Sequence, residues 1–119
     1  MGKREIVHVE IPAKDRKTAA EFYEKLFGWG MNHMDEMDYT VFDAGNTGGG
    51  LIPLTEQTKV DDVRVYVASE NIEADLKEVV ALGGEVVMPK TEIPENGHFA
   101  FFKDPTGNVL ALYTGQKKS

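Results

Sequence analysis

Two short segments of this sequence alternate between apolar and polar residues, the pattern of a β-strand with one buried face. They span residues 6–12 and 62–67, and each carries valine or isoleucine at every second position. The positions that alternate with these apolar residues are polar or aromatic. They are His8 and Glu10 in the first segment, and Asp62, Arg64 and Tyr66 in the second. The two segments lie 56 residues apart, which predicts an internal repeat.

The same offset of 56 residues continues into two predicted helices. Asp15 and Asn71 are residue types that favour the N-cap position, and apolar residues at helical spacing follow each of them. Gly28 is expected to end the first helix and Gly84 the second, with Gly83 as an alternative end. The apolar stripes predicted to face the core are Ala19, Phe22, Tyr23 and Leu26, then Ile72, Leu76, Val79 and Val80.

Three further strand candidates follow each predicted helix. They lie near residues 30–34, 38–43 and 49–54, and near 85–90, 98–103 and 108–113. Each half therefore has the order β-α-β-β-β, with module 1 at about 5–54 and module 2 at about 61–114. We predict a single α+β domain over residues 1–119, in which the strands form a curved mixed sheet, or cup, with a helix packed on the outer face of each module.

Composition narrows the possible functions. The chain has 13 Lys and Arg against 20 Asp and Glu, and the formal charge of −7 disfavours nucleic acid as a partner. The chain contains no cysteine, so disulfides, thiolate nucleophiles and cysteine metal clusters are excluded. No apolar run approaches the roughly 18 residues of a membrane helix. We therefore expect a cytoplasmic protein that binds neither nucleic acid nor membrane.

Four motifs make the chain resemble the vicinal oxygen chelate superfamily, which includes glyoxalase I, bleomycin resistance proteins, extradiol dioxygenases and methylmalonyl-CoA epimerase. The motifs are residues 6–12, 22–29, 48–51 and 104–108. The resemblance covers nearly the whole chain and is strongest to the small glyoxalase-like branch. It implies the paired-module fold, a homodimer and, in metal-using relatives, four ligands from the first and fourth strands of each module.

Carried over to this sequence, that ligand set is incomplete. The first position falls on His8, which can bind a metal. The equivalent position of module 2 falls on Arg64, whose guanidinium has no lone pair for a cation. The other two fall on Ala111 and within residues 49–53, where no side chain can coordinate. Because a catalytic site normally takes three protein ligands, we expect no tightly bound metal and no other cofactor. A divalent metal held by other residues is the alternative.

Polar and aromatic side chains on the predicted cup lining favour a site for a small organic molecule. Glu10 and Arg64 share this lining, where the arginine could bind a carboxylate or phosphate, or the two residues could form an internal ion pair. The predicted ligand-binding residues are His8, Glu10, Tyr39, Arg64, Tyr66, Phe101 and Tyr113. The sequence assigns no catalytic residue.

The leading hypothesis is a glyoxalase-like domain that binds a small molecule in the cup between its modules. One alternative is an enzyme, either a metal-dependent lyase, isomerase or dioxygenase related to lactoylglutathione lyase, or a metal-free acid–base catalyst that uses His8 and Glu10. A second alternative is an interaction module whose polar face serves a homodimer. One fold hosts many activities, so the choice depends on the site.

Overall fold

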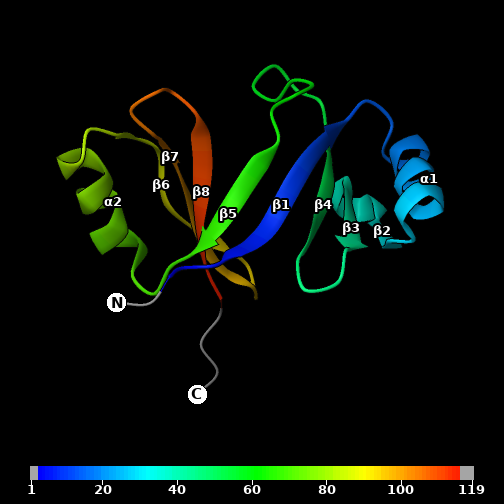
Figure 1. Ribbon diagram of the computed structural model, residues 1–119, viewed down its shortest axis with the longest axis horizontal. Helices are drawn as coiled ribbons and strands as arrows, with labels where there is room; N and C mark the ends of the chain where they lie inside the picture. Colours follow the sequence, from blue (N-terminus) through cyan, green and yellow to red (C-terminus); the bar gives the residue numbers. More distant parts are fainter. Residues whose placement is uncertain (1–2, 116–119) are drawn as a thin grey trace. The chain divides into compact units, whose positions relative to one another are not determined.

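The computed structural model describes residues 3–115 (Figure 1). Over these residues the chain forms two tandem βαβββ modules with strands of mixed direction, which confirms the predicted α+β class. Residues 7–65 pack as one compact unit, and residues 66–115 together with 3–6 pack as another. No helix of the described residues is long and apolar enough to cross a membrane.

The first unit is a four-stranded mixed sheet with one helix, coloured blue to green in Figure 1. Its strands lie in the order β2-β3-β4-β1; β1 is parallel to β4, and the other pairs are antiparallel. The elements are β1 (Ile6–Ala13), α1 (Arg16–Phe27), β2 (Gly30–Met34), the short 3₁₀ helix η1 (Asp35–Met37), β3 (Tyr39–Asp43) and β4 (Gly48–Pro53).

Both ends of α1 are where the sequence predicts them. The Asp15 carboxylate accepts hydrogen bonds from the backbone amides of Lys17 and Thr18 at 3.0 and 3.2 Å. These bonds, chiefly the one from Thr18, lower the pKa of the Asp15 carboxyl. At the other end Gly28 adopts a left-handed conformation with φ of 74°, and its amide donates to the carbonyl of Glu24.

The rotation of α1 differs from the predicted stripe. Ala20 is buried, and Tyr23 packs against the core, whereas Phe22 and Leu26 are each 58% exposed. Aromatic stacking accounts for this rotation, because Tyr23 lies on Trp29, which in turn lies on Phe42, with ring centroids 5.3 and 4.7 Å apart. The buried centre of this unit consists of Ala13, Ala20, Phe42 and Leu51.

The second unit repeats this plan, and its strands lie in the order β5-β8-β7-β6. β5 is parallel to β8, and the remaining pairs are antiparallel. Its elements are β5 (Arg64–Ala68), which begins just before the unit boundary, α2 (Ile72–Ala81), β6 (Glu85–Ile93), β7 (Gly97–Lys103) and β8 (Val109–Thr114). Ile72, Leu76, Ala100 and Leu112 form its buried core.

The start of α2 is confirmed, its end follows the alternative at Gly83, and part of its stripe differs from prediction. The Asn71 side chain accepts a hydrogen bond from the Ala74 amide at 3.0 Å. The left-handed residue is Gly83, with φ of 99°, and not Gly84. Gly84 is needed for close packing instead, because a Cβ there would press on the Lys103 carbonyl and the Val79 side chain. Val80, predicted to face the core, is 58% exposed.

Candidate functional site

The face of the first sheet that lies away from α1 carries a cluster of polar side chains. On β1, Val9 packs into the core beneath the helix, so alternation places His8 and Glu10 on the opposite face. On β3, Phe42 packs into the same core, and Tyr39 therefore lies on the same face as the β1 pair. All three side chains are partly shielded from solvent.

A continuous hydrogen-bonded network joins these three residues. The His8 Nε2 and Tyr39 Oη atoms lie 2.7 Å apart, and Tyr39 Oη donates to Glu10 Oε2 at 3.0 Å. His8 Nε2 is 3.8 Å from the same carboxylate oxygen. The imidazole and phenol rings are close to parallel, with an interplanar angle of 7°. We call this His8–Tyr39–Glu10 set the polar network.

Gly50 on β4 provides the space that the phenol ring of the polar network occupies. It pairs with Glu10 on one side and with Val41 on the other, and so lies in the middle of the three strands. A Cβ built on Gly50 would overlap the ring and hydroxyl of Tyr39. Glycine at this position therefore provides the space in which the ring lies. This role is not predicted by the sequence patterns above, although the glycine run at residues 48–50 is a signal of it.

The surroundings of His8 favour its neutral form. Burial lowers the pKa of His8 below its usual value, and the negative charge of Glu10 acts in the opposite direction but is the smaller effect. A neutral imidazole both donates and accepts one hydrogen bond. The polar network therefore combines a neutral base, a phenol and a carboxyl group within hydrogen-bond distance.

The other predicted residues lie elsewhere in the fold. Arg64 is the first residue of β5 and is half-buried. Tyr66 and Phe101 are in edge-to-face contact, with ring centroids 6.3 Å apart, on one face of the second sheet. Both pair in register with Ala111, which is fully buried. Tyr113 lies on the same face and donates to the Asn96 carbonyl at 2.7 Å. Three of the predicted residues are thus aromatic side chains on one face of the sheet of the second unit.

The donor set does not match the metal site that the superfamily resemblance implies. Among residues 3–115, no three or more His, Asp or Glu side chains are grouped so that they could hold a metal ion. Ala111 offers no donor atom, and at Gly50 the available space contains the Tyr39 hydroxyl. His8 and Glu10 supply two donors, one fewer than a catalytic metal normally takes from protein.

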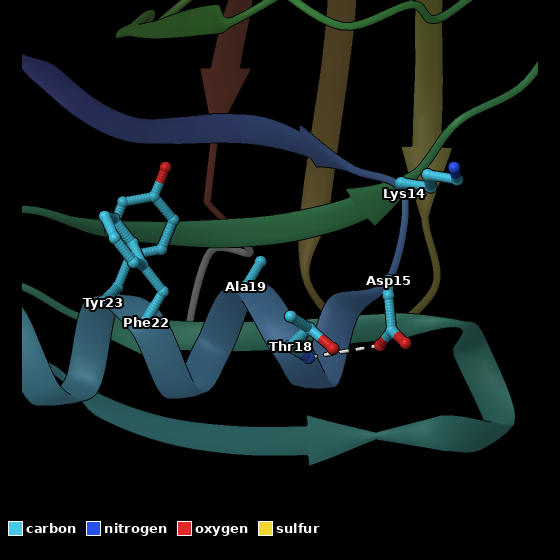
Figure 2. Close-up of a pocket in the computed structure, with 6 residues that line it drawn as sticks. All are labelled: Lys14, Asp15, Thr18, Ala19, Phe22 and Tyr23. Atoms are coloured by element: carbon cyan, nitrogen blue, oxygen red, sulfur yellow. Dashed lines mark hydrogen bonds between the residues drawn. The ribbon is translucent and has the colours of Figure 1, made fainter.

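A shallow groove runs along the first turns of α1, on the helix side of the first sheet. Figure 2 shows its labelled side chains, with the Asp15 carboxylate bonded to the Thr18 amide at one end and Phe22 and Tyr23 at the other. Its lining consists of Lys14, Asp15, Thr18, Ala19, Phe22 and Tyr23. None of the predicted ligand-binding residues lines this groove, and the polar network lies on the opposite face of the sheet.

Comparison with known proteins gives a consistent family match. The family model described as Glyoxalase/Bleomycin resistance protein/Dioxygenase superfamily matches residues 5–112. The protein CFP32 of Mycobacterium tuberculosis is 26% identical over 117 residues, which cover 92% of this chain and 45% of CFP32. The chain thus spans about half the length of this curated relative.

Two solved structures show the same fold at low sequence identity. The hypothetical protein BH1468 from Bacillus halodurans has a TM-score of 0.74 at 15% identity, and the match covers 99% of each chain. Methylmalonyl-CoA epimerase from Mycobacterium tuberculosis has a TM-score of 0.71 at 15% identity, with coverage of 94% of this chain and 88% of the epimerase. At this level of identity the similarity concerns the fold alone.

Proposed function

The chain belongs to the Glyoxalase/Bleomycin resistance protein/Dioxygenase superfamily, and on that premise we propose that it binds a small organic molecule at the polar network, without a tightly bound catalytic metal. The observation that supports this most directly is the hydrogen-bonded chain from His8 through Tyr39 to Glu10. Ligand sites are typically concave and apolar with a few polar groups that orient the ligand. The polar network supplies such groups on one face of a sheet.

The arrangement favours hydrogen bonding over metal coordination. A metal bound by His8 and Glu10 would compete with the Tyr39 hydroxyl, which is bonded to both residues. In the superfamily pattern a further metal ligand would come from β4. The Tyr39 ring lies where a side chain at Gly50 on β4 would project, so the space for such a ligand is occupied. A metal-dependent activity of the lactoylglutathione lyase or dioxygenase type is therefore the weaker proposal.

The aromatic face of the second unit is proposed separately, as an apolar surface that a small molecule can contact. Tyr66, Phe101 and Tyr113 share this face. Aromatic side chains can cover a planar ligand at little conformational cost, since each has only two rotatable side-chain bonds. Arg64 is a proposed anchor for an acidic group on a ligand. Phe101→Ala and Arg64→Gln test these two roles separately.

Ligand-observed NMR with a library of small carbonyl and hydroxyl compounds tests the proposal, followed by titration of each hit. His8→Ala and Tyr39→Phe are expected to weaken the hits about tenfold or more, as expected for the loss of a buried hydrogen bond. His98→Ala, which removes a half-buried histidine from β7, is the matched control. Unchanged affinities in both network variants would contradict the binding site.

Elemental analysis of protein purified without chelator tests the absence of a tightly bound metal. Near-stoichiometric transition metal, with ion-dependent thermal stabilisation that His8→Ala abolishes, would overturn this part of the proposal. Light scattering on the same purified protein measures the mass of the particle in solution. A mass of one chain would refute the homodimer that the superfamily resemblance implies.

A further inference from the structure

One side of α1 exposes large apolar side chains to water. Phe22, Leu26 and Phe27 are 58%, 58% and 56% exposed. Phe22 and Leu26 are four residues apart, so they are neighbours on the helix surface. The ring of Tyr23 contacts the rings of Phe22 and Phe27, with centroids 5.3 and 6.2 Å apart. The three exposed residues therefore form one connected surface, which we call the apolar ridge.

The apolar ridge is large enough to be an interaction site. Each of its three side chains exposes more than half of its area, so together they leave about 300 Å² of apolar surface in water. Single exposed apolar residues are ordinary, but connected patches of about 300–600 Å² are often functional. The shallow groove of Figure 2 runs along the same helix as far as Phe22 and Tyr23. A side chain of a partner can lie in this groove beside the ridge.

Two residues of opposite charge border the apolar ridge. Glu21 directly precedes Phe22, and Lys25 directly precedes Leu26. Their side chains are 68% and 74% exposed, and Lys25 Nζ lies 3.3 Å from Glu21 Oε1. The other edge of the ridge is formed by Tyr23, which packs against the core. The solvent side of the ridge thus has one negative and one positive charge, one helical turn apart.

We propose that the apolar ridge binds a second copy of this chain, with the two α1 helices antiparallel about a twofold axis near residues 23 and 24. This arrangement places Phe22 against the partner's Leu26, and Leu26 against the partner's Phe22. In an antiparallel pair about a twofold axis, the same edges of the two helices meet. Each Glu21 therefore lies beside the partner's Lys25, and the charged edge is complementary to itself.

The charges favour this occupant and this direction. Each chain has a formal charge of −7, so two copies repel each other unless the surfaces that meet are locally balanced. The edge formed by Glu21 and Lys25 is balanced. A parallel pair of helices would instead place the charged edge of each copy against the edge of the other that contains Tyr23. The antiparallel pair keeps the charges together at the rim and the apolar side chains at the centre.

The area of the ridge also suits a dimer contact. A standard interface buries roughly 800 Å² per partner, and a little more than half of this area is apolar. The apolar ridge supplies about 300 Å² of it. The exposed polar residues around it, which include Lys14, Thr18, Glu21 and Lys25, supply the rim. All of these residues belong to the first unit, and none is part of the polar network.

Sedimentation over a series of protein concentrations tests the contact surface. The wild type is expected at twice the chain mass of 13.2 kDa. Leu26→Asp puts two charges into the centre of the dimer and should raise its dissociation constant about 100-fold. Val80→Asp is the matched control, because Val80 is also 58% exposed but lies on α2. It should leave the dissociation constant unchanged, and circular dichroism checks that both variants are folded.

Charge reversal tests the antiparallel pairing. Glu21→Lys and Lys25→Glu, made separately, should each raise the dissociation constant about tenfold, because two attractive pairs become repulsive. An equimolar mixture of the two variants should form a mixed dimer about as tight as the wild type, since opposite charges then meet at both contacts. The pair within each helix stays broken in the mixture, so a loss of helix stability alone predicts no recovery.

Four results would overturn the proposal. They are a wild-type mass of one chain at every concentration, an unchanged dimer in Leu26→Asp, an equally weakened dimer in Val80→Asp, and no recovery in the mixture of the two charge variants.

Discussion

Gly50→Ala is the sharpest test of how the polar network is assembled, because one methyl group acts on one neighbouring side chain. A Cβ at this position overlaps only atoms of Tyr39 among its nearest neighbours. The ring must move, and its hydrogen bonds to His8 and Glu10 are lost together. The backbone of Gly50 needs no change, since its φ lies outside the left-handed region.

The size of the effect follows from two opposing contributions. Two partly buried hydrogen bonds, each worth about 0.5–1.5 kcal/mol net, account for about 1–3 kcal/mol of lost stability. Replacing glycine with alanine in a strand restores about 0.5–1 kcal/mol, because the unfolded chain has less conformational freedom to lose. The expected net destabilisation is therefore about 0–2.5 kcal/mol, with a central value of about 1 kcal/mol. In a Tyr39→Ala background only the favourable contribution remains, so the same substitution should become neutral or stabilising.

Urea unfolding of the wild type, the two single variants and the double variant measures this coupling. The double-mutant cycle should give an interaction energy of about 1–3 kcal/mol between positions 39 and 50. Gly49→Ala is the control, because a Cβ at Gly49 faces the core and meets the Val9 carbonyl and the Phe42 ring. It should be strongly destabilising and additive with Tyr39→Ala. If the free-energy changes of Gly50→Ala and Tyr39→Ala were also additive, Gly50 would not be the residue that provides space for the Tyr39 ring.

Three further predictions concern stability. Burial lowers the folded-state pKa of His8, so the unfolded chain takes up this proton first as the pH falls. The contribution of neutral His8 to the free energy of unfolding should therefore be complete above about pH 6.5 and decline below it. His8→Gln should remove this part of the decline when thermal unfolding is measured as a function of pH. Asn71→Ala should cost about 1 kcal/mol in urea unfolding, because the Ala74 amide loses its cap; an unchanged midpoint would contradict this. Thr40→Val should cost about 1–3 kcal/mol, since the fully buried hydroxyl accepts from Arg16 at 2.8 Å and bonds His33 at the same distance; a cost below that of an exposed threonine would rule out this role.

Local sequence signals predicted the elements well where the deciding interactions are also local. Asp15 and Asn71 cap their helices through side chains that reach amides two or three residues ahead. Helix rotation was less predictable. The apolar spacing predicts Phe22 and Leu26 in the core, but both are exposed, because the side of α1 that packs on the sheet is the one whose Tyr23 stacks on Trp29. That contact joins a helix to the chain beyond it, and periodicity within the helix contains no information about it.

The sequence by itself determined which side chains share a face of each sheet, because alternation along a strand is a property of the backbone alone. It therefore grouped His8 with Glu10. Only the tertiary structure decided that Tyr39 bonds to both, since it lies 31 and 29 residues away from them along the chain. That contact depends on the strand order and on the space above Gly50, and both arise from pairing between distant strands.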